Sequence, residues 1–302
     1  MTISIKEAID HYIQNSIKKS REPFLKLLMK AVFAGVFIGM GAAGSSVAAH
    51  SVANIGIARL ITGVVFPVGL MMVILLGGEL FTGDCLMTMA IPSHRISWKK
   101  LGQVLATVYL GNFIGAAFMA LLVSQSGQFD YSSGLLGAYT IKVAMGKVDM
   151  SFTTALISGV LCNILVCAAV LMAGCTKDLQ GKLMASFFVI MLFAISGMEH
   201  CVANMYYITA GMIAKWNPEY ARLAMEQYGI NQQMLMQINP VNFIVKNLLP
   251  VTIGNILGGS VAFGIPLFYI HHVKEKVILQ SKVKEVEIND NNDFNRSSGV
   301  AS

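Results

Sequence analysis

Two short polar clusters interrupt apolar stretches of this 302-residue sequence. The first reads Gly77-Gly78-Glu79-Leu80-Phe81-Thr82-Gly83-Asp84, and the second reads Ser196-Gly197-Met198-Glu199-His200-Cys201-Val202-Ala203-Asn204. Of six histidines, only His200 lies deep in an apolar segment, where an imidazole is costly to bury and usually functional. It can donate a hydrogen bond, or a proton, near neutral pH. The Thr82 hydroxyl is able to donate to an anion or to bond the imidazole.

Glu79 and Glu199 occupy the same position in the two clusters. Carboxylates facing a pore would repel an anion, so we expect them to accept hydrogen bonds from backbone N–H groups freed by the interruptions. Asp84 is expected to cap the helix that follows it. The competing interpretations are a structural role for His200, bonded to a carbonyl, and a helix-capping role for Thr82.

The composition indicates a chain that lies in a lipid bilayer. Hydrophobic residues make up 55% of the sequence and charged residues only 13%, about half their usual share of roughly a quarter. A transmembrane helix needs about 20 mostly apolar residues, and several stretches reach that length without an internal charge. We predict an all-α membrane protein with six spans, at 27–50, 58–92, 99–126, 152–176, 182–213 and 245–271.

The second and fifth spans are too long for one straight helix, and each contains one of the polar clusters. We therefore expect both to be broken in the middle. A break in hydrocarbon is tolerated only where it is buried in protein or lines a cavity. Two such breaks predict a shared cavity, and the partial positive charge at half-helix N-termini favours anions there.

The two halves of the chain resemble each other. Three pairs of segments match, the last of them weakly: Gly77-Gly78-Glu79 with Gly197-Met198-Glu199, Leu110-Gly111-Asn112-Phe113-Ile114-Gly115 with Ile253-Gly254-Asn255-Ile256-Leu257-Gly258, and Gly35-Val36-Phe37 with Gly159-Val160-Leu161. Because each half has three spans, the halves are predicted to lie in opposite orientations, as an inverted repeat with its site at the midplane. Packing between helices is the favoured role for the glycines of the second pair.

The basic residues predict the orientation. The formal net charge is +6, and we interpret it as a topology signal rather than as a nucleic-acid-binding surface. One side would carry most of the basic residues, namely Lys6, Lys18, Lys19, Arg21, Lys26, Lys30, Arg95, Lys99, Lys100, Lys177, Lys182, Lys274, Lys276, Lys282 and Lys284. The other side would carry fewer, such as Arg59, Lys142 and Lys147. Both termini are therefore predicted in the cytoplasm, with the chain in the inner or plasma membrane.

Three regions follow from this organisation. Residues 1–26 are predicted to form an amphipathic cytoplasmic helix, which spans 4–20 and begins with a capping box at Ser4 and Glu7. Residues 27–272 form the six-helix membrane domain, and the charged tail, 273–302, is expected to be disordered. The five cysteines, odd in number and without a CxxC pair, are expected to be reduced thiols. We expect no cleavable signal peptide, metal, cofactor or enzymatic activity.

Three segments resemble the signatures of the formate–nitrite transporter family: 78–83, 197–205 and Pro250-Val251-Thr252-Ile253-Gly254-Asn255. The resemblance covers about residues 1–272. It implies a homopentamer of six-helix, aquaporin-like protomers in the lipid bilayer, each with its own pore. It also implies a role for His200 as the central histidine, for Thr82 in the omega loop, and for Lys147 as a conserved lysine. The other implied pore residues are Asn163 and Asn255, a cytoplasmic constriction of Leu70, Phe66 and Phe193, and an outer constriction of Leu80 and Phe81.

The resemblance implies a small monovalent anion as the substrate. We favour formate. Nitrite and hydrosulfide remain alternatives, because the first cluster departs from the Asp-Leu-Phe-Thr-Ser-Thr of some formate channels. In the expected mechanism Lys147 and the helix dipoles attract the anion, and His200 shares or gives a proton, positioned by Thr82. The neutral acid then crosses the apolar constriction, which a bare anion enters only at high cost.

Two other function classes compete with this interpretation. A neutral-solute channel of the aquaporin type would have a similar architecture, but no Asn-Pro-Ala pair lies at the breaks. A membrane-anchor subunit of a redox enzyme would need haem ligands, usually several intramembrane histidines, and only His200 lies deep in a span.

Overall fold

The computed structural model describes residues 2–272, so the predicted tail, 273–302, and its four lysines lie outside the described residues. Every regular element within 2–272 is helical, and one isolated β-bridge joins Thr2 to Thr176. Six segments are long and apolar enough to cross a membrane: Phe24–Ala49, Ile55–Leu76, Trp98–Gln125, Phe152–Gly174, Leu179–Ser196 and Pro240–His272. Their number agrees with the sequence prediction, and the second and fifth helices end near the middle of the predicted spans 58–92 and 182–213.

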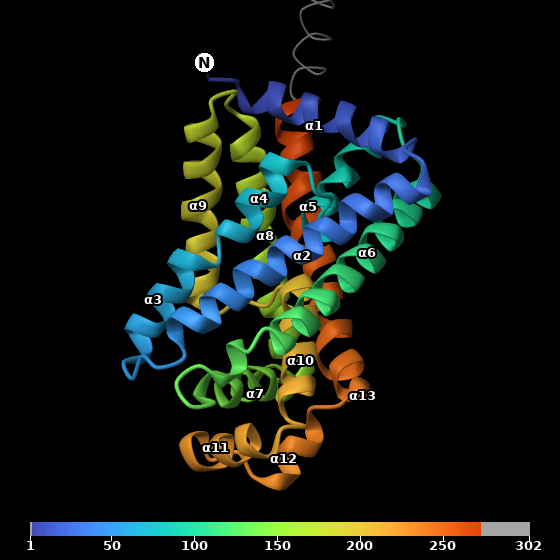
Figure 1. The fold of residues 1–302 in the computed structure, drawn as a ribbon. Coiled ribbons are helices and arrows are strands. Elements are labelled where there is room, and N and C mark those ends of the chain that lie inside the picture. The colour runs from blue at the N-terminus through green and yellow to red at the C-terminus, as the bar shows by residue number, and fades with distance from the viewer. Residues whose placement is uncertain (1, 273–302) are drawn as a thin grey trace, which may run out of the picture.

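Short helices cover both ends of the helix bundle (Figure 1). Helix α1 (Ile5–Ser20) lies across one end and begins with the predicted capping box, in which the Ser4 Oγ accepts from the Glu7 N–H at 3.3 Å. At the opposite end lie α7 (Leu135–Val148), α11 (Pro218–Tyr228) and α12 (Gln232–Gln237). The sequence did not predict α7, and the segment 214–240, between the predicted fifth and sixth spans, is largely helical.

Both polar clusters lie where the backbone leaves the helical conformation. Helix α4 (Val68–Leu76) ends at Gly77 and α5 (Phe81–Asp84) follows, whereas α9 (Leu179–Ser196) ends at Gly197 and α10 (Cys201–Ala214) follows. Gly77 has a φ of +75° and Gly197 a φ of +67°, a left-handed conformation that glycine adopts without steric cost. The chain between each pair of helices is extended, which leaves backbone polar groups to be satisfied by other partners.

Equivalent contacts define the register of the internal repeat. A Cβ on Gly115, in α6 (Trp98–Gln125), would lie 2.0 Å from the Val32 carbonyl oxygen of α2 (Phe24–Ala49). A Cβ on Gly258, in the last span, would lie 2.2 Å from the Val160 carbonyl oxygen of α8 (Phe152–Gly174). Val32 therefore corresponds to Val160, and these two helix pairs approach too closely for any side chain at either glycine.

The weakest of the three sequence matches is therefore wrong by one helical turn. Since Val32 pairs with Val160, Gly159 corresponds to Ala31 and not to Gly35. Residues one turn apart share a face of a helix, so small residues at either position satisfy the same packing requirement. Sequence similarity alone could not separate the two registers.

The same register extends the repeat to the helices at the two ends of the bundle. It pairs Lys19 in the last turn of α1 with Lys147 in the last turn of α7. The buried positions also coincide along the two helices: Ile9 with Gly137, Ile13 with Ile141, Ser16 with Ala144, and Ser20 with Val148. Each half thus consists of one end helix followed by three spans, and the two end helices lie at opposite ends of the bundle (Figure 1).

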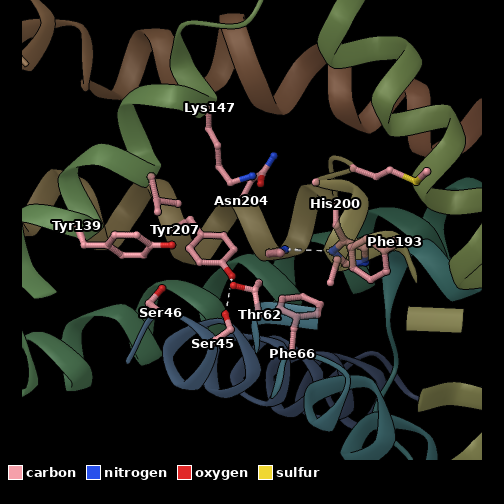
Figure 2. Close-up of a pocket in the computed structure, with 15 residues that line it drawn as sticks. Ser45, Ser46, Thr62, Phe66, Tyr139, Lys147, Phe193, His200, Asn204 and Tyr207 are labelled. Carbon is pink, nitrogen blue, oxygen red and sulfur yellow. Dashed lines mark hydrogen bonds between the residues drawn. The ribbon is translucent and has the colours of Figure 1, made fainter. Parts of the chain in front are cut away.

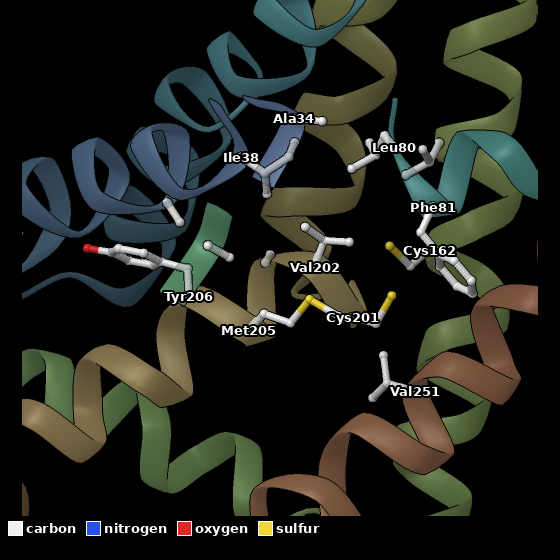
Figure 3. Packing of buried hydrophobic residues seen from close by; sticks show 14 of the residues in the cluster. Ala34, Ile38, Leu80, Phe81, Cys162, Cys201, Val202, Met205, Tyr206 and Val251 are labelled. Carbon is white, nitrogen blue, oxygen red and sulfur yellow. The ribbon is translucent and has the colours of Figure 1, made fainter. Parts of the chain in front are cut away.

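The core between the halves is apolar and rich in thiols. Figure 3 shows Cys162 and Cys201 packed among Leu80, Phe81 and Val251. All five cysteines are free, as the sequence predicted, and only Cys175 is partly exposed. Apolar packing of this kind surrounds both breaks, so any polar group there needs a partner within the protein.

Candidate functional site

Two buried asparagines hold the breaks. The Oδ1 of Asn112 accepts from the Phe81 N–H at 2.9 Å, and its amide nitrogen donates to the Glu79 carbonyl, also at 2.9 Å. In the second half, the Oδ1 of Asn255 accepts from the Cys201 N–H at 3.0 Å and its amide nitrogen donates to the Glu199 carbonyl at 3.0 Å. Each amide also donates to the first span of its half, at the Ala31 and Gly159 carbonyls.

The expectation that Glu79 and Glu199 hold the breaks is wrong. A break frees both N–H and C=O groups, and an amide side chain satisfies both, whereas an ionised carboxylate only accepts. The Glu199 carboxylate instead accepts from Lys147 Nζ at 2.8 Å and from the amide of Asn204 at 2.6 Å. Glu79 forms an ion pair with Lys19, so each glutamate pairs with the lysine of its own end helix.

Asp84 does not cap the helix that follows it, contrary to expectation. Its side chain makes no capping hydrogen bond, and its Oδ1 forms an ion pair with Lys19. Burial lowers the pKa of the Lys19 ammonium, but the charges of Asp84 and Glu79 outweigh burial and raise it above its ordinary value. Lys19 therefore remains charged and joins α1 to the first break.

His200 and Thr82, which the sequence placed in different halves, meet at the centre. The Nε2 of His200 lies 2.8 Å from the Thr82 hydroxyl, and both side chains are buried. The Nδ1 of His200 accepts from the Ala203 N–H at 3.1 Å and so caps α10. Because Nδ1 accepts, the neutral ring carries its proton on Nε2 and donates it to Thr82. The hydroxyl proton of Thr82 is then free to point to another acceptor.

A cavity of about 160 Å³ opens beside His200 (Figure 2). It is lined by Ser45, Ser46, Thr62, Phe66, Tyr139, Val143, Lys147, Phe193, Ala194, Gly197, Met198, His200, Ala203, Asn204 and Tyr207. We call it the outer cavity because it lies toward α7, at the end of the bundle that the basic residues predict to be outside. Lys147 Nζ lies 5.3 Å from the centre of the Tyr207 ring, and the Tyr207 hydroxyl lies 3.0 Å from Ser45 Oγ. Its polar lining thus consists largely of hydrogen-bond donors.

The sequence interpretation missed most of these donors. Ser45, Ser46 and Thr62 come from the first two spans, Tyr139 comes from the unpredicted α7, and Tyr207 comes from α10. No motif connects them. Hydroxyl groups within apolar segments were the only available signal.

A second cavity, of about 470 Å³, lies on the opposite side of the breaks, toward α1. We call it the inner cavity. Its lining includes Tyr12, Lys19, Glu22, Leu70, Gly77, Gly78, Glu79, Leu80, Gly83 and Asp84. Six of these have an equivalent in the outer cavity through the repeat: Lys19, Gly77, Gly78, Leu80, Gly83 and Asp84 correspond to Lys147, Gly197, Met198, His200, Ala203 and Asn204. The two cavities are therefore built from equivalent positions, and they share no lining residue.

The predicted constriction residues separate differently from the expected division. Phe66 and Phe193 line the outer cavity, with ring centres 5.4 Å apart in an edge-to-face arrangement. Leu70 and Leu80 both line the inner cavity, on the side of α1. Phe81 lines neither cavity and packs against Tyr109 at 4.9 Å. The expected cytoplasmic set of Leu70, Phe66 and Phe193 is therefore divided between the two cavities, and Leu80 of the expected outer set lies in the same cavity as Leu70.

Asn163 and Asn255 also lie away from both cavities. Both side chains are fully buried, and the Asn163 amide donates to the Asn255 carbonyl at 2.6 Å. Asn163 therefore supports the asparagine that holds the second break. Within residues 2–272, no group of three or more histidine, cysteine or acidic side chains is arranged to hold a metal ion.

Comparison with known proteins gives a consistent result. The family described as "Formate/nitrite transporter" matches residues 6–269. "Formate channel FocA" of Haemophilus influenzae is 36% identical over 265 residues, covering 86% of this chain and 91% of that protein. "Formate channel FocA" of Escherichia coli K12 is 33% identical over 258 residues, covering 84% and 89%. A solved structure described as "Pentameric formate channel with formate bound" matches with a TM-score of 0.75 at 34% identity, covering 82% of this chain and 97% of that chain.

Proposed function

This chain belongs to the formate/nitrite transporter family, and from that premise we propose that it carries formate across the membrane together with a proton. The contact between Thr82 and His200, at 2.8 Å, carries the proposal. It joins the two breaks at one point, with a cavity on either side. The relatives that are described as formate channels support formate as the anion.

The outer cavity would receive the anion by hydrogen bonding. Lys147 is paired with Glu199 at 2.8 Å, so the charge of its ammonium group is largely compensated at a distance. Close to the cavity wall, however, its remaining N–H groups and the hydroxyls of Tyr139 and Tyr207 can donate to a carboxylate. This arrangement favours a small anion without binding it so tightly that it cannot leave.

His200 and Thr82 would act at the entrance to the dry segment. A bare anion pays heavily to enter a low-dielectric constriction, and a neutral acid does not. His200 lines the outer cavity, and the proton on its Nε2 can be shared between Thr82 and an approaching anion. Sharing disperses the negative charge until a proton from solution joins the anion. The neutral acid then passes the apolar side chains of Phe66 and Phe193 at the outer cavity and those of Leu70 and Leu80 at the inner cavity.

We also propose the orientation and assembly that the sequence indicated. Both termini would lie in the cytoplasm of a cell with this protein in its inner or plasma membrane, with α1 at the cytoplasmic surface. Five protomers would assemble, as in the pentameric relative. Large apolar side chains on the outside of the bundle, such as Phe33 and Phe188, are more than half exposed and would face lipid or neighbouring protomers.

Flux measurements in liposomes test the proposal. The purified chain should carry formate with coupled proton entry, and the same panel should include nitrite, hydrosulfide and glycerol. The variant His200→Asn should lose proton-linked uptake. Glycerol flux without formate flux would defeat the proposal, as would pH-dependent formate uptake that His200→Asn leaves unchanged. If nitrite or hydrosulfide crosses faster than formate, that anion and not formate is the substrate.

A further inference from the structure

The two lysine–glutamate pairs differ in their third member. In the outer cluster, Glu199 accepts from Lys147 and from the amide of Asn204. The repeat places Asp84 where the second half has Asn204, because Glu79 corresponds to Glu199 five residues earlier in each cluster. The inner cluster therefore contains a carboxylate in place of an amide.

This exchange leaves the inner cluster with more carboxylates than one ammonium can satisfy. The Nζ of Lys19 contacts an oxygen of Glu79 and an oxygen of Asp84. The second oxygen of Asp84, Oδ2, is buried and has no hydrogen-bond partner within the described residues. The side chain of Asp84 is only 4% exposed, and it lines the inner cavity. A buried, ionised and half-satisfied carboxylate is costly.

We propose that Asp84 is a proton-binding site that faces the inner cavity, and that it exchanges its proton with the inner solution. Binding a proton turns the carboxylate into a carboxylic acid, with one O–H donor and one carbonyl acceptor. The O–H is a neutral donor, like the N–H that the Asn204 amide offers to Glu199. The protonated inner cluster then has, like the outer one, one lysine, one glutamate and a neutral donor at the position of Asn204.

The groups around Asp84 do not supply a second counter-ion. The titratable and charged groups that surround it or line the same cavity are Tyr12, Lys18, Lys19, Glu22, Lys30, Glu79, Cys85, Cys167 and Lys182. Lys30 is held by Glu22 at 2.8 Å and approaches Glu79 only at 3.6 Å. The Tyr12 hydroxyl donates to the Gly83 carbonyl at 2.7 Å. Lys19 is therefore the ammonium group that pairs with Asp84.

The protonation state of Asp84 would set the ease of anion passage through the inner cavity. An ionised Asp84 adds a negative charge to the cavity wall and repels an anion, whereas the protonated form does not. The proton site itself stands whatever the substrate is, but this effect on transport rests on the proposed function. Low pH would then open the inner path to anions, and high pH would close it.

The variant Asp84→Asn tests the proposal, because it gives the inner cluster the amide that the outer cluster has at Asn204, with little change in shape. Exchange of labelled formate is measured in liposomes with equal pH on both sides. At about pH 8 the variant should exchange formate roughly tenfold faster than the unaltered chain. This is the effect that one negative charge has on an anion about 10 Å away at a dielectric constant of about 20. At about pH 5 the two rates should agree. A purely structural role for Asp84 predicts no such gain.

Infrared difference spectroscopy of the purified full-length chain supplies the second readout. The unaltered chain should show a carboxylic-acid C=O band that disappears as pH rises, and Asp84→Asn should lack it. Asn204→Asp, the mirror variant, should gain such a band. If Asp84→Asn keeps both the band and the original pH dependence of exchange, the proposal is overturned. If the band behaves as expected but the unaltered chain exchanges no formate, the proton site stands and the proposed function fails.

Discussion

Replacing Asn255 by leucine should lower the free energy of unfolding by removing hydrogen bonds at the second break, with little change in the size of the side chain. Asn255 is fully buried and makes three hydrogen bonds, with the Cys201 N–H at 3.0 Å, the Gly159 carbonyl at 2.8 Å and the Glu199 carbonyl at 3.0 Å. The variant Asn255→Leu leaves the Cys201 N–H and the Glu199 carbonyl without this partner, whereas the Gly159 carbonyl lies within helix α8. A buried unsatisfied group costs about 1–3 kcal/mol, although hydrogen bonds between membrane helices average only about 0.6 kcal/mol. We expect a loss of roughly 2–6 kcal/mol.

Unfolding of the detergent-solubilised chain, by heat or by SDS, measures this loss. Asn112→Leu should cost a similar amount, because Asn112 holds the first break through the equivalent bonds. The control is Asn15→Leu on the exposed face of α1, which should change stability by no more than about 0.5 kcal/mol. If Asn255→Leu unfolds with the same free energy as Asn15→Leu, the claim that the asparagine amide holds the break is refuted.

Three further predictions follow from close packing, cavity lining and titration. Gly258→Ala should reduce the yield of folded protein, because its Cβ would lie 2.2 Å from a carbonyl oxygen of α8, whereas Gly102→Ala, with open space around it, should not. Phe66→Ala should raise the ratio of lactate to formate flux in liposomes, because it removes one of two rings that narrow the outer cavity. Burial and a 2.6 Å hydrogen bond to Asp130 raise the pKa of Tyr220 to about 12. The free energy of unfolding should therefore fall as pH rises from about 10, the ordinary tyrosine pKa, to about 12, and Tyr220→Phe should make this fall smaller.

The six spans and the two breaks were predictable because they depend on local composition. A bilayer requires about 20 apolar residues per span, and Gly77 and Gly197 each stand two residues before a glutamate that a continuous apolar helix would not accommodate. The end helix α7 was not predictable in the same way. Its Gly137 packs directly beneath the Tyr220 ring, a contact between segments that lie far apart in the chain. Such packing, and not local propensity, stabilises short helices.

The central pair was predictable from residue type, whereas its surroundings were not. His200 is the one histidine deep in an apolar segment, and Thr82 is the one hydroxyl in the first polar cluster. The partner of Lys147 depends on how α7 lies against the second break. Because the sequence analysis did not predict α7, it could not identify Glu199 as that partner. The equivalence of Lys19 and Lys147 also required the register of the repeat. The similarity between the segments at Gly35 and Gly159 led to an alignment that differs from that register by one helical turn.

The division of labour at the breaks explains how this framework can tolerate changes in protonation. Neutral amides hold the freed backbone groups, through Asn112 and Asn255. The ionisable carboxylates of Glu79, Asp84 and Glu199 pair instead with lysines or with amides. Because no backbone hydrogen bond at either break depends on a carboxylate, a proton can bind or leave without unfolding the break. Had the glutamates held the breaks, each protonation would have replaced a charged acceptor of a backbone N–H by a weaker neutral one in an apolar core, and proton-linked transport would have been coupled to a loss of local stability.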